Sequence, residues 1–184
     1  MFVGRLTEKK GCEYLIQAMA QVQLELPDVE LVMIGDGPLK PQLEAQAAKL
    51  LRRYRFLGTQ PPDVVKNWMN RALLLAAPSV TASQGDSEGL PNVVLEAQAM
   101  ALPVVSTTHA GIPEAVIHEE TGFLTAERDV IKGLADYSLR LLKDPELWQR
   151  FSAKGREQVE ANFDRTKQTR VLEGIYEAVL KREL

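Results

Sequence analysis

The segment from residue 79 to residue 96 carries side chains suited to bind a phosphorylated ligand. Its first part, residues 79–89, is rich in glycine and small polar residues, and Pro91 is expected to open a helix. A loop of this kind at a helix N-terminus exposes backbone N–H groups, which suit phosphate. Glu88 precedes the expected helix and Glu96 lies inside it. Two carboxylates would thus flank a phosphate-sized site, and carboxylates accept hydrogen bonds from sugar diols.

A second group of candidate residues lies near the start of the chain. Arg5 and Lys10 stand in a glycine-bounded loop, residues 4–11. Arginine offers a fork of donors to phosphate oxygens and lysine offers a point charge. Together with the glycine loop, these cations fit a diphosphate clamp. Spacing alone favours plainer explanations: a solvated basic loop, a helix cap at Glu88 and a satisfied or exposed helix glutamate at Glu96.

The elements that must position these residues follow from hydrophobic periodicity. Short apolar runs alternate with amphipathic segments, which is typical of a parallel α/β sheet covered by helices on both faces. Strands are predicted at residues 2–3, 29–34, 54–57, 73–77, 103–107 and 122–125. Helices are predicted at residues 13–26, from 38 onward, and at 63–71, 91–100, 130–142, 145–162 and 166–181.

The loops after the strands are where such a sheet binds ligands. Residues 4–11, 35–38, 79–91 and 107–113 are therefore expected at one edge. Gly35-Asp-Gly-Pro38 lacks the third glycine of a dinucleotide fingerprint, so a tight turn explains it better. His109 is a candidate for contact with a donor or an acceptor.

Composition narrows the class of protein. A chain of 184 residues fits one domain, and its net charge of −3 argues against non-specific nucleic-acid binding. The single cysteine, Cys12, excludes an internal disulfide and fits a cytoplasmic protein. No apolar run approaches the roughly 20 residues that span a bilayer.

The motifs occur in the order seen in group 1 glycosyltransferases. The chain resembles the C-terminal domain of a family-four enzyme with the GT-B fold, a Rossmann-like parallel sheet with helices on both faces. The matching residues are Phe2-Val-Gly-Arg-Leu6, Lys10-Gly11, Gly35-Asp-Gly-Pro38, Phe56-Leu-Gly58, Glu88-Gly-Leu-Pro91, Glu96-Ala97, Pro103-Val-Val105, Gly111-Ile-Pro-Glu114 and Thr121-Gly-Phe-Leu124.

This resemblance implies a role for each matching residue. Arg5 and Lys10 would hold the donor diphosphate and neutralise the leaving group, and Glu88 would contact the sugar hydroxyls. Glu96 would bind the ribose hydroxyls. No cofactor or metal is implied, because cations and the helix dipole serve the diphosphate. The other donor-binding positions would be Gly4, Gly89, Leu90, Pro91 and Asn92, with Arg55, Phe56, Leu57 and Gly58 around the base.

Two segments depart from the family pattern. Ala110-Gly111 stands where many relatives have two glycines, and Ala126-Glu-Arg-Asp129 replaces the usual glycine-aspartate. Both departures bear on sugar specificity. A further expectation is that residues 1–184 form only the donor-binding half, and that an acceptor-binding N-terminal domain precedes them. Without that domain the chain should bind nucleotide weakly and transfer no sugar.

The whole protein is expected to move a sugar from a nucleoside diphosphate to an acceptor hydroxyl with retention, as in polysaccharide biosynthesis. It would be cytoplasmic and could reach the inner face of the membrane only through the other half. The final helix carries an apolar stripe, expected to be exposed here or covered in a dimer. Two alternatives stay open: a nucleotide-binding or interaction module without catalysis, and a GT-B nucleotide-sugar epimerase.

Overall fold

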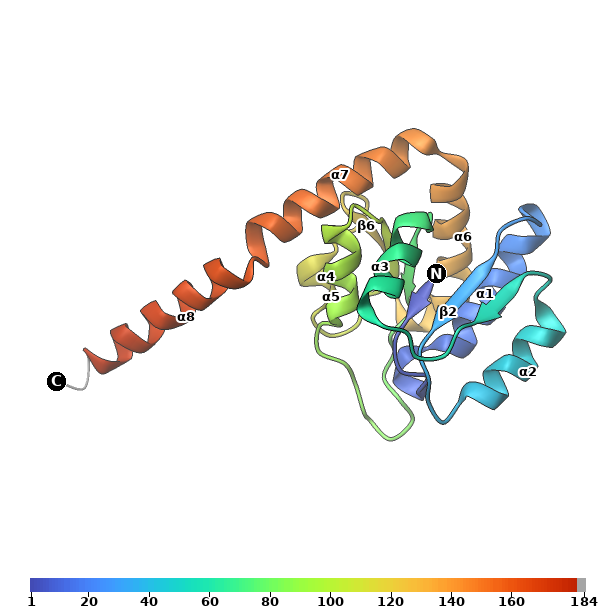
Figure 1. The fold of residues 1–184 in the computed structure, drawn as a ribbon, viewed down its shortest axis with the longest axis horizontal. Helices are drawn as coiled ribbons and strands as arrows, with labels where there is room; N and C mark the ends of the chain where they lie inside the picture. Colours follow the sequence, from blue (N-terminus) through green and yellow to red (C-terminus); the bar gives the residue numbers. More distant parts are fainter. Residues whose placement is uncertain (182–184) are drawn as a thin grey trace.

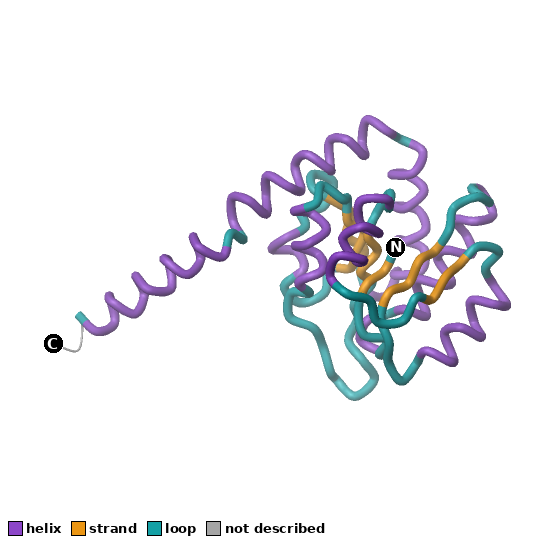
Figure 2. The backbone as a smooth tube through the Cα atoms, viewed as in Figure 1, coloured by secondary structure: helices purple, strands orange, loops and turns teal. Residues whose placement is uncertain are grey.

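The structure is a computed structural model that describes residues 1–181. In this part of the chain, parallel strands lie at the centre and helices surround them (Figures 1 and 2). The strands are β1 (Phe2–Val3), β2 (Leu31–Ile34), β3 (Tyr54–Phe56), β4 (Leu75–Ala77), β5 (Val104–Thr107) and β6 (Gly122–Thr125).

The strands form two three-stranded parallel sheets that meet at the start of the chain. Their orders are β1-β2-β3 and β4-β5-β6. Met1 joins them, because its carbonyl accepts from the Ala76 N–H at 2.8 Å and its amino group donates to the Leu74 carbonyl at 2.8 Å. The combined order, β3-β2-β1-β4-β5-β6, is that of a doubly wound Rossmann fold. The expected α/β fold is therefore confirmed, and β1 and β4 lie side by side at its centre.

Helices and single turns of 3-10 helix follow the strands in sequence. The helical elements are η1 (Glu8–Lys10), α1 (Cys12–Glu25), α2 (Lys40–Leu50), α3 (Pro62–Arg71), α4 (Asn92–Ala99), α5 (Ile112–Ala115), η2 (Glu127–Asp129), α6 (Val130–Lys143), α7 (Pro145–Asn162) and α8 (Arg165–Leu180).

Successive strand residues point to opposite faces of the sheet, so Leu75 and Val104 enter one buried cluster while Ala76 and Val105 enter the other.

The two clusters explain why the sheet is apolar on both faces. One cluster holds residues of α1, α2 and α6, such as Leu15, Leu43 and Leu134, and the other holds residues of α4 and α5, such as Val94 and Ile112. Burying a leucine-sized side chain contributes about 1.5–3 kcal/mol. The sheet is therefore fixed from both sides, and the loops at its carboxyl edge start from rigid strand ends.

Some element boundaries differ from the sequence prediction. The second helix begins at Lys40 and not at Pro38, which with Leu39 forms a turn. The Leu39 N–H donates to the Leu6 carbonyl at 3.2 Å, and this bond to the first loop holds the turn outside the helix. Pro41 then occupies the first turn of α2, where its missing N–H costs nothing.

Helix α8 extends away from the rest of the molecule (Figure 1). None of its residues is buried. The apolar stripe is 49–62% exposed, which confirms the expected exposure, and it consists of Val171, Leu172, Ile175, Tyr176, Val179 and Leu180. Within residues 1–181, no helix combines the length and apolar character needed to cross a membrane.

Gly11 is the point at which the first loop and β4 come closest. It has φ of 62°, and it both ends η1 and precedes α1. A Cβ at this position would lie 1.9 Å from the carbonyl oxygen of Pro78. Side chains avoid both this backbone conformation and this contact. Glycine here lets the loop after β1 approach the loop after β4.

Gly11→Ala is expected to destabilise the chain by at least about 2 kcal/mol, because it combines left-handed backbone strain with a backbone clash. Urea unfolding followed by circular dichroism measures this difference. Gly174→Ala is the matched control, since a Cβ there meets no atom within 4 Å. Equal unfolding midpoints for the two variants would show that the approach at Gly11 is unimportant.

Candidate functional site

The candidate site lies at the carboxyl edge of the sheet, between the loop after β1 and the loop after β4. The two loops are joined through their backbones, because the Val80 N–H donates to the Lys9 carbonyl at 2.9 Å. Loops after β5 and β6 border the same region. This is the edge where an open parallel sheet offers its strand-end loops and helix N-termini to ligands.

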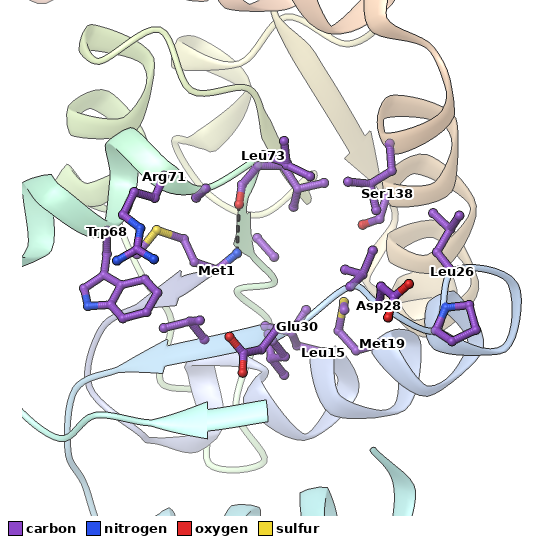
Figure 3. A pocket seen from close by; sticks show the side chains of 18 of the residues that line it. Met1, Leu15, Met19, Leu26, Asp28, Glu30, Trp68, Arg71, Leu73 and Ser138 are labelled. Atoms are coloured by element: carbon purple, nitrogen blue, oxygen red, sulfur yellow. Dashed lines mark hydrogen bonds between the residues drawn. The ribbon is translucent and has the colours of Figure 1, made fainter. Parts of the chain in front are cut away.

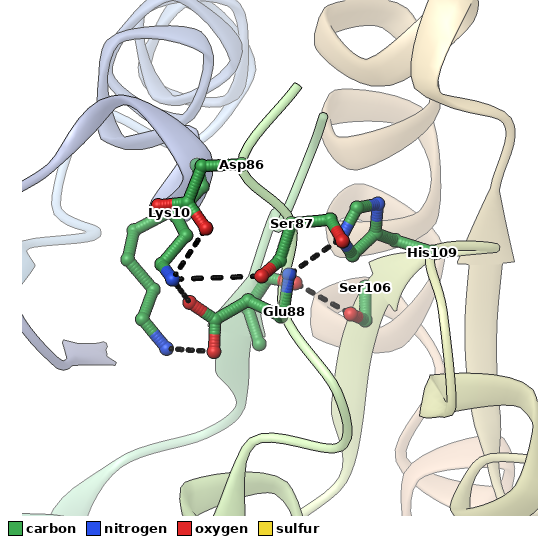
Figure 4. Close-up of polar contacts among 8 residues, drawn as sticks. Lys10, Asp86, Ser87, Glu88, Ser106 and His109 are labelled. Carbon is green, nitrogen blue, oxygen red and sulfur yellow. Dashed lines mark hydrogen bonds and ion pairs between the residues drawn. The ribbon is translucent and has the colours of Figure 1, made fainter. Parts of the chain in front are cut away.

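Charged side chains from the two loops meet across this edge (Figure 4). Lys10 Nζ lies 3.0 Å from Glu88 Oε2, and Lys9 Nζ lies 3.5 Å from Glu88 Oε1 and 3.1 Å from Asp86 Oδ1. The side chains of Lys10 and Glu88 are only 16% and 14% exposed. The hydrogen bond to Asp86, together with the charge of Glu88, raises the pKa of Lys9 above its usual value. Lys9 is therefore a cation at neutral pH.

Two further carboxylates hold the loop after β4 from outside the charged cluster. Glu8 accepts from the Ser83 N–H at 2.7 Å and from its hydroxyl at 3.0 Å. Glu127 accepts from the Thr81 N–H at 2.8 Å. Burial opposes ionisation of Glu127, but the hydrogen bonds from Thr81 and His109 outweigh it, so the pKa of this carboxyl is below its usual value.

The underside of the same loop rests on β5 and the loop that follows it. His109 is 3% exposed, and its Nε2 accepts from the Glu88 N–H at 3.1 Å. The hydroxyl of Thr107 donates to the Ser79 carbonyl. The Gly111 N–H donates to the Gly89 carbonyl at 3.2 Å. The backbone beside Glu88 is thus fixed by direct hydrogen bonds.

The structure brings several of the sequence-predicted residues together. Lys10 and Glu88 are paired, and Gly89, Leu90 and Pro91 lead directly from Glu88 into α4. The plainer interpretation of Glu88 as a helix cap is wrong, because Pro91 is the N-cap residue and no side chain caps α4. Glu88 is held by the lysines instead.

Asn92 and Glu96 lie one turn apart on α4, and both are exposed. Gly4 directly follows β1, and its N–H donates to the Ile34 carbonyl at 2.9 Å. Arg5 follows it and is exposed at the same edge. These residues border the charged cluster, and within residues 1–181 none of their side chains bonds to it.

The predicted base-binding residues divide between two places. Leu57 and Gly58 follow the carboxyl end of β3, where the Gly58 carbonyl accepts from the Gly35 N–H at 2.8 Å. Phe56 is part of β3 and packs edge-on against Tyr54. The side chain of Arg55 points elsewhere: its Nε donates to Glu30 at 2.8 Å, just before the amino end of β2. The structure therefore does not bring the Arg55 guanidinium to the other site residues.

Sequence reasoning missed the residues that hold the loop. Glu8, Lys9, Asp86 and Glu127 were not among the candidates, yet each bonds to or within the loop after β4. Glu127 and Thr81 are 46 residues apart. Glu8 and Lys9 did carry a signal, since they adjoin Lys10 in a loop already expected at the edge. Nothing in the sequence pairs Glu127 with Thr81.

Other features do not add to this site. Among residues 1–181, no three histidine, cysteine, aspartate or glutamate residues are grouped closely enough to hold a metal ion. A cavity of about 570 Å³ lies at the opposite, amino-terminal edge of the strands, beside Met1, Leu31, Trp68 and Leu73 (Figure 3). Its walls are mainly apolar, in contrast to the charged cluster between the loops.

The doubly wound sheet and the cation–carboxylate cluster at its carboxyl edge define an α/β protein with a site suited to a phosphorylated sugar. Comparison with known proteins makes the class specific. A family model described as "Glycosyl transferases group 1" matches residues 1–144. The chain belongs to the group 1 glycosyltransferase family, and the family resemblance inferred from the motifs is confirmed.

Individual relatives agree with this assignment. An amylovoran biosynthesis glycosyltransferase of Erwinia amylovora is 39% identical over 141 residues, which cover 76% of this chain and 34% of the relative. A GDP-mannose-dependent mannosyltransferase of Corynebacterium glutamicum, acting on a monoacylated phosphatidylinositol monomannoside, is 37% identical over 161 residues, covering 87% of this chain and 42% of the relative. The chain thus spans less than half the length of these curated relatives.

Solved structures share the same fold. The Anabaena protein HepE, solved in complex with UDP-glucose, superposes with a TM-score of 0.79 at 27% identity, over 96% of this chain and 48% of that protein. The chain therefore matches a part of GT-B glycosyltransferases.

Glu8→Ala is expected to loosen the loop after β4 without unfolding the protein. Losing two hydrogen bonds to a carboxylate should speed amide exchange at residues 82–88 by about tenfold or more. Because Ser83 is exposed, the free energy of unfolding should change by no more than about 0.5 kcal/mol. Hydrogen–deuterium exchange with mass spectrometry measures the loop. Glu44→Ala, an exposed change on α2, should leave it unchanged.

Proposed function

We propose that this chain holds the nucleoside diphosphate sugar donor of a retaining glycosyltransferase, between the loops of residues 4–11 and 79–91. The pair of Lys10 and Glu88, 3.0 Å apart beside the start of α4, carries the proposal. An ammonium group and a helix N-terminus suit a diphosphate. A carboxylate beside them suits the sugar hydroxyls. In this structure the two charged groups neutralise one another.

Donor binding would exchange this internal pair for contacts with the ligand. The diphosphate would take Lys10, and the sugar hydroxyls would donate to Glu88. Arg5 is exposed at the same edge and supplies a second cation to the diphosphate. Asn92 and Glu96, one turn apart on α4, would meet the phosphate and the ribose, and Leu57 and Gly58 at the end of β3 would line the base.

The proposed reaction breaks the bond between the anomeric carbon and the diphosphate oxygen. Negative charge grows on that oxygen, and Lys10, Arg5 and the α4 N-terminus stabilise it. With its oxygens taken by the sugar hydroxyls, Glu88 would be a poor covalent nucleophile. We therefore favour attack by the acceptor hydroxyl on the same face of the sugar. Its oxygen bonds to the anomeric carbon while its proton passes to the departing phosphate oxygen, so configuration is retained.

In the proposed whole protein, a part other than residues 1–184 would bind the acceptor. We propose that the exposed stripe of α8 packs against that part. An apolar stripe 49–62% exposed to water is destabilising unless another surface covers it. The chain spans 42% of the mannosyltransferase of Corynebacterium glutamicum, so a body of similar size is available to cover it.

Titration with UDP, GDP and ADP tests donor binding directly. The relatives include a protein solved with UDP-glucose and one named for GDP-mannose, so the base differs within the family. We expect one of the three to bind best, with a Kd in the high-micromolar to millimolar range, by isothermal titration calorimetry. Absence of binding by all three would favour the interaction module over the donor site.

Lys10→Ala should weaken binding of the preferred nucleoside diphosphate by about tenfold or more, because a charge-assisted hydrogen bond to phosphate is lost. In the whole enzyme it should lower kcat by about a hundredfold, the loss typical of one transition-state donor. Lys49→Ala removes an exposed lysine of α2 and serves as the control in both assays. A Lys10→Ala variant with wild-type binding and turnover would refute the assignment of Lys10.

Ile175→Lys tests the proposed partner of α8. In this chain alone the melting temperature should not change, because Ile175 is 54% exposed. In the whole protein the same change should lower the melting temperature, because it buries a charge between two surfaces. Glu173→Lys adds the same side chain two residues away and should be neutral in both. Equal behaviour of the two variants in the whole protein would mean that the stripe stays uncovered.

A further inference from the structure

Both ring nitrogens of His109 are engaged, and the direction of one bond fixes the protonation of the ring. The Glu88 N–H is a donor, so Nε2, at 3.1 Å, must be an acceptor without a hydrogen. Nδ1 lies 2.6 Å from Glu127 Oε1. A carboxylate only accepts, so Nδ1 carries the proton and donates it to Glu127. The neutral Nδ1–H tautomer is the form that satisfies both neighbours.

The position of His109 excludes a direct catalytic role. The residue is 3% exposed and lies beneath the loop, while the lysines meet Glu88 from the other side (Figure 4). With both nitrogens bound within the protein, no lone pair is available to a substrate. What the ring does control is the backbone of Glu88, whose side chain reaches Lys10 and Lys9.

Glu127 completes a continuous connection from the surface to the site. Its carboxylate holds the Thr81 N–H as well as the His109 ring, so it bonds to both the start of the loop and the ring beneath its end. Its side chain is one-third exposed and the ring is buried. This arrangement resembles the way a carboxylate orients a histidine elsewhere in proteins, with a backbone amide in place of a reacting group.

We propose that His109, held in its Nδ1–H tautomer by Glu127, is a positioning residue that aims Glu88 at the donor sugar. The proposal rests on the donor-binding function above, because Glu88 is taken to meet the sugar. The expected consequence is selective. Binding of the donor's sugar depends on His109, whereas binding of the nucleoside diphosphate, through Lys10 and Arg5, does not. His109 directly precedes Ala110-Gly111, and Glu127 belongs to Ala126-Glu-Arg-Asp129, the two segments where this chain departs from the family pattern.

The first measurement needs no ligand. Two-dimensional ¹⁵N NMR of the histidine rings at pH 7.5 reports which nitrogen carries the proton. We expect a protonated Nδ1 and an unprotonated Nε2 for His109. Protonation at Nε2 in the wild-type chain would overturn the proposal, because the Glu88 N–H then has no acceptor.

The second measurement compares UDP with UDP-glucose by calorimetric titration. His109→Phe keeps the ring volume and removes both hydrogen bonds, so UDP-glucose should bind about three- to tenfold more weakly while UDP is unchanged. His109→Gln can still offer an oxygen to the Glu88 N–H and should recover most of the loss. His118→Phe, the same change at the exposed second histidine, should have no effect on either ligand.

Glu127→Gln is the second variant, chosen because its partly exposed side chain makes folding robust to the change. Like His109→Phe, it should weaken the binding of UDP-glucose. It should also raise the fraction of His109 rings that carry the proton on Nε2. Equal loss of UDP and UDP-glucose in both variants would assign His109 a merely structural role and overturn the proposal. If the wild-type chain bound neither UDP nor UDP-glucose, the donor assignment for uridine nucleotides would fail. The NMR measurement of the ring tautomer would still test the hydrogen bonds of His109.

Discussion

The contact between the loop after β1 and the loop after β4 is the constraint on which the site depends. It exists because β1 and β4 are neighbours in the doubly wound order. Met1, just before β1, forms backbone hydrogen bonds with Ala76 in β4 and with Leu74 just before it. Gly11 lets the backbones touch, and the Val80 N–H bonds to Lys9. A charged cluster assembled from residues 78 positions apart needs such a fixed approach. Rigid strand ends supply it at the topological switch point, where open α/β sheets bind their ligands.

Electrostatics then determine how the charged groups of the site are arranged. Two lysines face Glu88 and Asp86, so the cluster is internally neutralised and no buried charge lacks a partner. An uncompensated charge at this degree of burial would be costly. A phosphorylated sugar carries both the negative charge and the hydroxyl donors needed to replace these pairs. The cluster therefore holds its groups near the positions in which the proposed donor would meet them.

The loop after β4 shows how a polar segment is ordered without a hydrophobic core of its own. Glu8, Glu127 and the lysines hold it from the sides, and His109, Thr107 and Gly111 hold it from below. The bonds from Glu8, Glu127, His109 and Thr107 each reach a backbone group of the loop. Such bonds specify backbone geometry, which is what a site built on N–H groups and one carboxylate requires.

The sequence by itself determined the α/β class, most element positions and the placement of the loops of residues 4–11 and 79–91 at one edge of the sheet. Apolar periodicity, glycine positions and ordered motifs are local properties, so they can be recognised in the sequence alone. Only the tertiary structure decided that Glu88 is held by lysines and is no helix cap, that Arg55 turns to Glu30, and that α2 starts at Lys40. It also joined Glu127 to Thr81 and His109. These outcomes depend on which strand ends become neighbours, and long-range adjacency leaves no periodic trace in the sequence.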